Sequence, residues 1–238
     1  MYIEAFQKFK PHLERGTYDH QDWSYFQPMP KSRAYTFEYA LINFVHNVHN
    51  TVVELGTIRS YCHGGDPRCS TDDKTAWKPG DMSFWDWGAG CFSRVMVECI
   101  SDVNQRFVLN TVDIVDSHIE RCKLITRDYR KYMQYHVQNS TDYLRRFHGQ
   151  IDLLYMDTGD IWPLEPTATL SLEECKIVVE RNLISPYGII VMDDIKNTTP
   201  KKFGEASNLA KGKYSLEYLT NHGFEIIVDE YQVILRKR

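Results

Sequence analysis

The chain has 238 residues, of which 42% are hydrophobic and 25% are charged. These fractions are those of ordinary globular domains, which excludes the fibrous and intrinsically disordered classes. With 28 Lys and Arg against 32 Asp and Glu, the net charge is −4. The chain therefore lacks the basic surface that is typical of nucleic-acid-binding proteins.

The sequence contains no hydrophobic run of the roughly 20 residues that a membrane-spanning helix requires. Charged residues occupy the N-terminal stretch where a secretory signal would have its apolar core. We therefore expect a soluble, cytoplasmic protein with no membrane partner. The six cysteines form no C-x-x-C pair, and in this compartment we expect reduced thiols, several of them in the core.

The first third of the chain mixes two regular elements with irregular stretches. Residues 1–33 combine charges, prolines and aromatics, which indicates a short helix followed by an irregular arm. Apolar residues at helical spacing predict an amphipathic helix over 34–49. The β-branched run 51–56 predicts a buried strand ended by glycine. Residues 60–90 form a long polar stretch rich in tryptophan, which is typical of a binding loop or a lid.

The remainder of the chain alternates short apolar runs with amphipathic segments. The runs that we predict as strands span residues 106–114, 133–138, 151–157 and 187–194, followed by two more within 224–238. The predicted helices span residues 91–103, 117–129, 140–147, 170–184 and 213–223. Ser171 and Glu174 have the spacing of a capping box at the start of the fourth of these helices.

Alternation of strands and helices is typical of a largely parallel sheet covered by helices on both faces. The two final strands are joined by so short a turn that they must be antiparallel. We therefore predict an α/β fold, a Rossmann-like doubly wound sheet of about seven strands with an antiparallel C-terminal hairpin. This sheet would form a single domain over residues 34–238.

In such sheets ligands bind beyond the carboxyl ends of the strands, so the residues at these ends are candidates for function. Gly56, after the first predicted strand, permits a tight turn and the close approach of a ligand. Asp113, after the second, can accept hydrogen bonds from both hydroxyls of a ribose. Ser140 and Thr141 follow the third strand, where their polar groups would edge an adenine.

Three carboxylates follow the next two predicted strands. Asp157 ends the fourth strand, and Asp193 and Asp194 end the fifth. Packing carboxylates together without a counter-charge is costly, and a divalent cation with hard oxygen ligands resolves that cost. The sequence therefore predicts a Mg²⁺ site formed by these three side chains.

Four stretches, VVELGTIRS, TVDI, IDLLYMDTGD and YGIIVMDD, resemble in order the motifs of class I S-adenosylmethionine (SAM)-dependent methyltransferases. The resemblance covers residues 34–238 and is closest to the branch in which E-L-G-T-x-R-G replaces a glycine-richer loop. That branch includes the macrocin-type, metal-dependent sugar O-methyltransferases, and catechol-type O-methyltransferases are more distant relatives. Ser60 departs from the pattern, because the branch has glycine at this position.

The resemblance implies a set of cofactor-binding residues, namely Glu54, Gly56, Thr57, Arg59, Ser60, Asp113, Ser140, Thr141 and Asp157. It also places Asp157, Asp193 and Asp194 at the positions that bind Mg²⁺ in the metal-dependent members. It does not fix the catalytic base, for which three candidates remain: Asp160, His63 and Glu165.

These features predict an enzyme that transfers a methyl group from SAM to a hydroxyl oxygen. In this hypothesis Mg²⁺ acidifies the hydroxyl and a nearby base takes its proton. The acidic centre suits a neutral sugar or glycan, on whose ring the 60–90 stretch would stack through Trp77, Phe84, Trp85 and Trp87. A phenolic or catechol-type acceptor and a catalytically silent binding module are the alternatives. The aromatic N-terminal arm is a candidate for self-association into a homo-oligomer.

Overall fold

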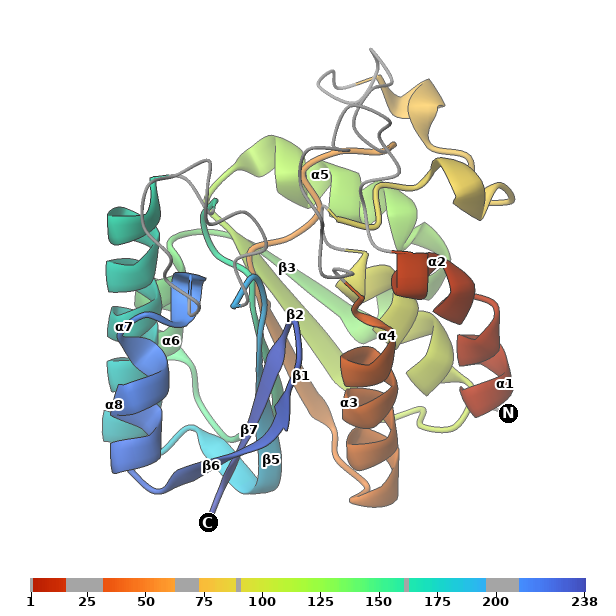
Figure 1. Ribbon diagram of the computed structural model, residues 1–238. Helices are drawn as coiled ribbons and strands as arrows, with labels where there is room; N and C mark the ends of the chain where they lie inside the picture. The colour runs from red at the N-terminus through yellow and green to blue at the C-terminus, as the bar shows by residue number, and fades with distance from the viewer. Residues whose placement is uncertain (1, 16–31, 63–72, 89–90, 161–162, 196–209) are drawn as a thin grey trace.

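The computed structural model describes residues 2–15, 32–62, 73–88, 91–160, 163–195 and 210–238. These residues build a seven-stranded sheet in the order β3-β2-β1-β4-β5-β7-β6 (Figure 1). Its strands are β1 (Thr51–Leu55), β2 (Val108–Asp113), β3 (Met133–Val137), β4 (Ile151–Met156), β5 (Ile184–Met192), β6 (Phe224–Asp229) and β7 (Val233–Lys237). Strands β1 to β5 are parallel, and β7 is antiparallel to both of its neighbours. The predicted doubly wound sheet with an antiparallel terminal hairpin is thus confirmed.

Helices cover both faces of the sheet (Figure 1). One face carries α3 (Ala34–His46), α4 (Phe92–Ser101) and α5 (Asp116–Ile125), and the other carries α6 (Ser140–Arg146), α7 (Leu164–Glu180) and α8 (Ser215–Asn221). The N-terminal helices α1 (Tyr2–Gln7) and α2 (Lys10–Arg15) pack on α4 and α3 respectively. In the described part of the chain, none of the helices combines the length and the apolar character needed to cross a membrane.

The alternation of side chains along each strand divides the hydrophobic core in two. On β4, Leu153 and Tyr155 face the cluster beneath α3 and α4, whereas Leu154 and Met156 face the cluster beneath α6, α7 and α8. Because helices shield both faces, the central strands are buried along most of their length. This is the reason that short apolar runs mark them in the sequence.

The tryptophans of the 60–90 stretch lie in the core. Trp85 is 1% exposed, and its ring centroid lies 4.3 Å from that of Trp77 and 5.3 Å from that of Trp87. Trp87 in turn stacks on His12 of α2, with 5.1 Å between the ring centroids. Buried indoles cannot stack on a sugar, so the structure does not support that prediction for these three residues. Phe84 is half-buried.

Helix α7 begins at Leu164 and not at residue 170 as predicted. Pro163 precedes it, and the fixed φ of proline suits the entry to a helix. Ser171 and Glu174 lie inside the helix and are buried, so the predicted capping box is wrong. Instead, the Ser171 hydroxyl lies 3.1 Å from the Ser215 hydroxyl and joins α7 to α8.

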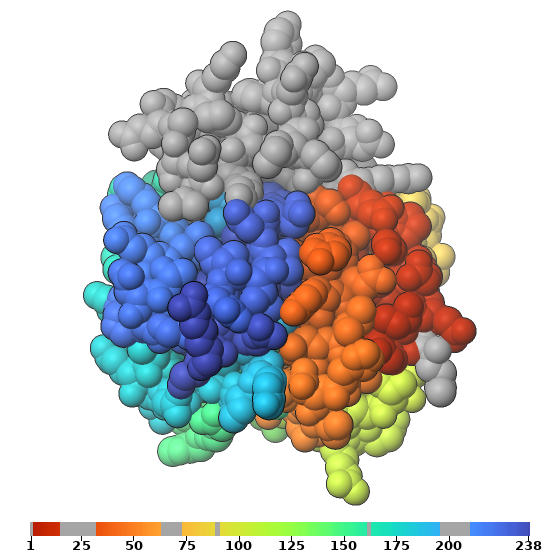
Figure 2. Space-filling model, turned by 60° about the horizontal axis from the view of Figure 1, so that its bottom comes forward, coloured from red at the N-terminus to blue at the C-terminus, as the bar shows by residue number. Residues whose placement is uncertain are grey.

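The two ends of the described chain meet beside α3. Figure 2 shows α3, in orange, between the N-terminal helices in red and the C-terminal hairpin in blue. The hydroxyl of Thr36 on α3 donates a hydrogen bond to the side-chain carbonyl of Gln232, immediately before β7. Residues around position 33 are thereby held at the carboxyl edge of the sheet.

Candidate functional site

A cavity of about 210 Å³ opens at the carboxyl ends of the central strands. It lies where the strand order reverses between β1 and β4, which is the usual ligand crevice of doubly wound sheets. The residues that line it are Gly56, Thr57, Arg59, Gly88, Asp113, Ile114, Val115, His118, Asp157, Gly159, Asp160, Asp194 and Lys211.

The turn after β1 is held tightly between the neighbouring strands. Gly56 has a φ of +79°, and a Cβ added there would lie 2.4 Å from the carbonyl oxygen of Asp157. Its N–H donates to the carbonyl of Val112 at 2.8 Å, while Asp157 N–H donates to Leu55 at 2.8 Å. Glycine is therefore required here both by the backbone conformation and by the close approach of β4.

Asp113 lies at the end of β2 with its side chain 10% exposed. Its Oδ2 accepts a hydrogen bond from the Thr57 N–H at 3.0 Å and lies 3.1 Å from Nδ1 of His118. Its Oδ1 accepts from the Val115 N–H at 2.8 Å. These contacts fix the carboxylate at the mouth of the cavity and tie the loop after β1 to the loop after β2.

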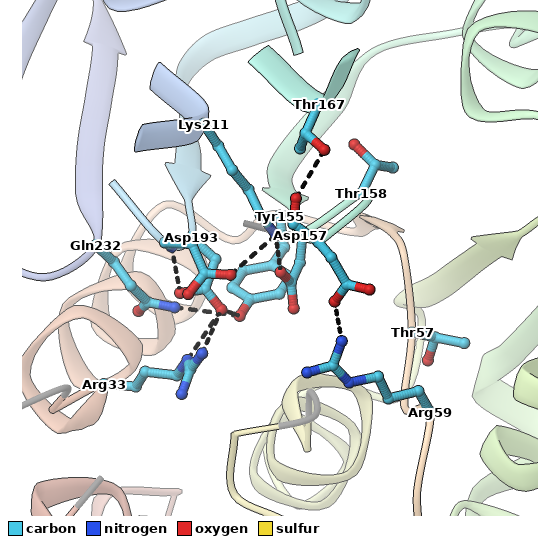
Figure 3. Close-up of polar contacts among 12 residues, drawn as sticks. Arg33, Thr57, Arg59, Tyr155, Asp157, Thr158, Thr167, Asp193, Lys211 and Gln232 are labelled. Carbon is cyan, nitrogen blue, oxygen red and sulfur yellow. Dashed lines mark hydrogen bonds and ion pairs between the residues drawn. The ribbon is translucent and has the colours of Figure 1, made fainter. Parts of the chain in front are cut away.

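Asp157 and Asp194 meet at one ammonium group, as Figure 3 shows for Asp157. Nζ of Lys211 lies 2.7 Å from Oδ1 of Asp157 and 3.0 Å from Oδ2 of Asp194. The Lys211 side chain is only 5% exposed. Asp194 has a φ of +54°, in the left-handed region that aspartate tolerates better than most residues.

The third predicted ligand, Asp193, is fully buried and paired with a different cation (Figure 3). Both Nε and Nη2 of Arg33 lie 2.9 Å from its Oδ2. The hydroxyl of Tyr155 donates to the same oxygen at 2.6 Å, and the Gln232 amide donates to that hydroxyl at 3.1 Å. Asp193 is therefore part of a closed network beneath the cavity.

The predicted Mg²⁺ site at Asp157, Asp193 and Asp194 is not supported. The carboxylates come together at neighbouring strand ends, but Lys211 and Arg33 supply the counter-charge that the sequence argument assigned to a metal. Among the described residues no group of three or more His, Cys, Asp and Glu side chains is arranged to hold a metal ion. The donor set therefore does not fit the metal-binding branch of the resemblance.

Burial and charge shift the proton affinities of the pair formed by Asp157 and Lys211. Burial raises the pKa of Asp157 above its usual value, against the opposing effect of the Lys211 ammonium. Burial alone would lower the pKa of Lys211, but the carboxylates of Asp157 and Asp194 outweigh it and raise that pKa above its usual value. Lys211 is therefore a permanent cation at the wall of the cavity.

Four of the predicted cofactor residues do not line the cavity of the described structure. Glu54 is fully buried and accepts hydrogen bonds from the hydroxyls of Ser93 at 2.5 Å and Thr111 at 2.6 Å. Ser60 is buried and donates to Asp86. Ser140 and Thr141 are buried in the first turn of α6, beside β2. Gly56, Thr57, Arg59, Asp113 and Asp157 do line the cavity.

The three candidates for the catalytic base are in different situations. Asp160 lines the cavity, with its carboxylate held by the Arg59 guanidinium. Glu165 is exposed on α7 and pairs with Lys213 and Tyr214, so it is not part of the cavity wall. His63 lies outside the described residues.

Sequence reasoning missed the two cations and His118. Arg33 precedes α3, and Lys211 lies in a short 3₁₀ turn (Ala210–Gly212) before α8, so neither follows a parallel strand. No local pattern marks either residue as a partner for the strand-end carboxylates. His118 could have been found from the sequence, because it lies in the first turn of α5, shortly after Asp113.

Solved structures of other proteins share this architecture. Methyltransferase PaMTH1 from Podospora anserina, solved with S-adenosylhomocysteine (SAH), has a TM-score of 0.56 at 11% identity, covering 100% of this chain and 87% of that one. A proposed caffeoyl-CoA O-methyltransferase from Staphylococcus aureus has a TM-score of 0.54 at 10% identity, covering 98% and 90%. The O-methyltransferase TomG from Streptomyces achromogenes, solved with SAM, has 0.51 at 12% identity, covering 98% and 87%.

The chain has the Rossmann-like methyltransferase fold. At these identities the likeness establishes the fold and not the reaction. No family model matches the sequence, and a search of curated proteins finds no relative.

Glu54 is expected to make the protein less stable as the pH rises. Burial raises its pKa from 4.5 to about 7, so between these values the folded chain keeps a proton that the unfolded chain has lost. The free energy of unfolding should therefore fall by about 3 kcal/mol across this range because of Glu54 alone. Urea unfolding at a series of pH values should show this component in the native protein and not in Glu54→Gln. An unchanged pH slope in Glu54→Gln, or an equal change in the exposed control Glu180→Gln, would contradict the assignment.

Proposed function

We propose that this chain is a SAM-dependent O-methyltransferase. The observation that carries the proposal is the Gly56 turn and the Asp113 carboxylate facing one cavity, at the switch point of a sheet with the methyltransferase fold. The Podospora and Streptomyces proteins, which hold SAH and SAM respectively, support the same class of ligand.

The cavity residues fit an adenosyl ligand. A carboxylate has about four acceptor positions, and the Thr57, Val115 and His118 contacts use three of those on Asp113. Among the described residues, one position on Oδ1 is left for a ribose hydroxyl. Ile114, the residue next to Asp113, is 67% exposed and offers an apolar surface to the adenine ring.

On the acceptor side, the charged residues of the cavity would orient a hydroxyl and receive its proton. When bound, SAM supplies a methyl group that passes to the acceptor oxygen as the carbon–sulfur bond breaks and its electron pair stays on sulfur. We propose that Asp160 takes the proton that leaves the oxygen, because it lines the cavity and its side chain is 64% exposed. Arg59 holds that carboxylate in place.

A phenolic hydroxyl is the acceptor that this site favours. The sequence favours a sugar on the assumption that Mg²⁺ would acidify an aliphatic hydroxyl, and the donor set does not support that metal. A phenol has a pKa of about 10 and needs far less help to lose its proton. The fold likeness to a proposed caffeoyl-CoA O-methyltransferase is in keeping with such an acceptor.

Calorimetry with SAH tests the proposed cofactor. Native protein should bind SAH, and Asp113→Ala should bind it roughly 10- to 100-fold more weakly, the cost of a hydrogen bond to a charged group. Asp116→Ala is the matched control, because Asp116 is an exposed residue at the start of α5 that does not line the cavity. Failure of native protein to bind SAH would refute the proposed function, and equal affinity in Asp113→Ala would refute the role of Asp113.

Release of SAH in the presence of candidate acceptors tests the reaction. A panel of monophenols, catechols and sugars should give turnover with the phenolic compounds. Turnover with sugars alone would reverse the choice of acceptor. Tight SAH binding without turnover on any hydroxyl compound would indicate a silent binding module.

A further inference from the structure

We propose that Lys211 is the fixed cation of this site, that it stands where a divalent metal would otherwise bridge Asp157 and Asp194, and that its ammonium holds the reacting oxygen of the acceptor. The part that concerns the acceptor rests on the proposed function. The part that concerns the metal does not, because it follows from the contacts of Lys211 alone.

Lys211 is built into the site by its backbone. The 3₁₀ turn that carries it contacts α7 and α8. Its neighbours Ala210 and Gly212 are buried, and a Cβ at Gly212 would lie 2.9 Å from Ile195 and 3.0 Å from Leu216. The turn therefore has little freedom to move, and the ammonium is directed from a rigid base to the strand ends.

Each carboxylate of the cluster already has a cationic side chain as its partner. Asp157 and Asp194 share the Lys211 ammonium at 2.7 and 3.0 Å, and Asp193 is paired with Arg33. Two fixed cations thus face three carboxylates. A Mg²⁺ ion that bridged Asp157 and Asp194 would sit about 2.0–2.1 Å from their carboxylate oxygens, and the ammonium that contacts the same two carboxylates would repel it. Lys211 and a metal are therefore mutually exclusive occupants.

The same geometry narrows the class of acceptor. An ammonium has three N–H donors. Among the described residues, Lys211 donates a hydrogen bond to Asp157 and forms an ion pair with Asp194, and it lines the cavity. The remaining N–H can hold a single acceptor oxygen, whereas a metal could chelate two vicinal oxygens. Lys211 thus suits an acceptor with one hydroxyl that becomes anionic, and a vicinal diol would gain nothing.

Metal binding to native protein and to Lys211→Met tests the exclusion. Methionine keeps the length of the buried side chain and removes the charge. We expect millimolar Mg²⁺ or Mn²⁺ to leave the melting temperature of native protein unchanged and to raise that of Lys211→Met, with Mn²⁺ retained in equilibrium dialysis by the variant alone. Lys213→Met, which removes a half-buried lysine two residues away that pairs with Glu165, should behave as native protein.

Metal retained by native protein, or by neither protein, would overturn the proposal. If Lys211→Met does not fold, native protein decides alone: dialysis that shows bound Mn²⁺ overturns the exclusion, and dialysis that shows none supports it. SAH calorimetry in chelator and in Mg²⁺ separates this result from the proposed function. SAH affinities that agree within about twofold in chelator and in Mg²⁺ support Lys211 as the cation, whereas SAH binding that requires Mg²⁺ overturns this role. If SAH binds under neither condition, the proposed function is refuted, and the metal experiment still decides the role of Lys211.

With SAH binding established, the acceptors test the remaining part. Monophenols should be methylated in chelator as well as in Mg²⁺, and the KM of a monophenol should rise at least tenfold in Lys211→Met. A catechol methylated far better than its monophenol, and only with Mg²⁺ present, would overturn the assignment of Lys211 to the acceptor oxygen.

Discussion

Replacing Gly56 with alanine is expected to destabilise the protein by about 3 kcal/mol or more and to weaken SAH binding. The left-handed conformation costs a side-chain-bearing residue about 1–2 kcal/mol, and overpacking adds about 1–3 kcal/mol. Both costs apply here, because φ is +79° and the new Cβ would lie 2.4 Å from the backbone oxygen of Asp157. The atom that it meets is backbone, which cannot rotate away.

Gly223→Ala separates the two costs. Gly223 has a φ of +87°, and no atom lies within 4 Å of a Cβ added there. This variant should lose only the conformational part, about 1–2 kcal/mol, and should bind SAH as native protein does. Urea unfolding of both variants and calorimetry with SAH make the comparison. Equal losses of stability would mean that β4 moves away from the turn at little cost, contrary to the packing described here.

The sheet could be predicted because each strand has a recognisable pattern in its own stretch of sequence. Strands buried on both faces contain short apolar runs, as residues 153–156 show, and the helices between them have their own periodicity. The start of α7 could not be predicted in this way. Its first turn follows Pro163 and contains Glu165 and Pro166, so the apolar spacing that marks a helix begins only later in the sequence.

Only the part of the candidate site that lies at the strand ends could be predicted from the sequence. The parallel strands carry Gly56, Asp113 and Asp157 to one edge, so their positions follow from the strand order. The partners of the carboxylates do not, since Arg33 lies 160 residues from Asp193 and Lys211 lies 54 residues from Asp157. A cluster of acidic residues in a sequence indicates that a counter-charge is needed, and it does not indicate whether a metal or a side chain provides it.

The aromatic stretch shows the same limit. Tryptophans within a polar segment are equally compatible with a ligand-binding surface and with a second layer of core. Here helix α2 and the turn before it supply the covering surface, since His12 of α2 and Phe9 of the turn contact the tryptophan rings. The sequence favours a ligand because the covering partner lies within residues 1–33, which the sequence predicts only as a short helix followed by an irregular arm, with no sign that they pack on the tryptophans.

Replacing Arg33 with alanine is expected to cost about 3–5 kcal/mol of stability, the usual penalty for leaving one member of a buried ion pair without its partner. The Arg33 side chain is 4% exposed and Asp193 is 0% exposed, so water cannot replace the guanidinium. Urea unfolding should show this loss. Arg127→Ala, which breaks an exposed pair with Asp128, should change stability by less than about 1 kcal/mol.

The double variant Arg33→Met with Asp193→Asn shows whether the loss comes from the stranded charge. Methionine fills part of the space of the guanidinium, and asparagine still accepts the hydrogen bond that Tyr155 donates at 2.6 Å. If uncompensated charge is the cause, the double variant should be clearly more stable than Arg33→Ala, because neutral replacements of buried pairs are often tolerated. If it is as unstable as Arg33→Ala, the role of Arg33 is to pack against Tyr231, whose ring centroid lies 5.1 Å from the guanidinium carbon. The first outcome means that the charge of Arg33 stabilises the buried network around Asp193, and the second means that its packing does. Only the first outcome requires a cation at position 33 in addition to Lys211.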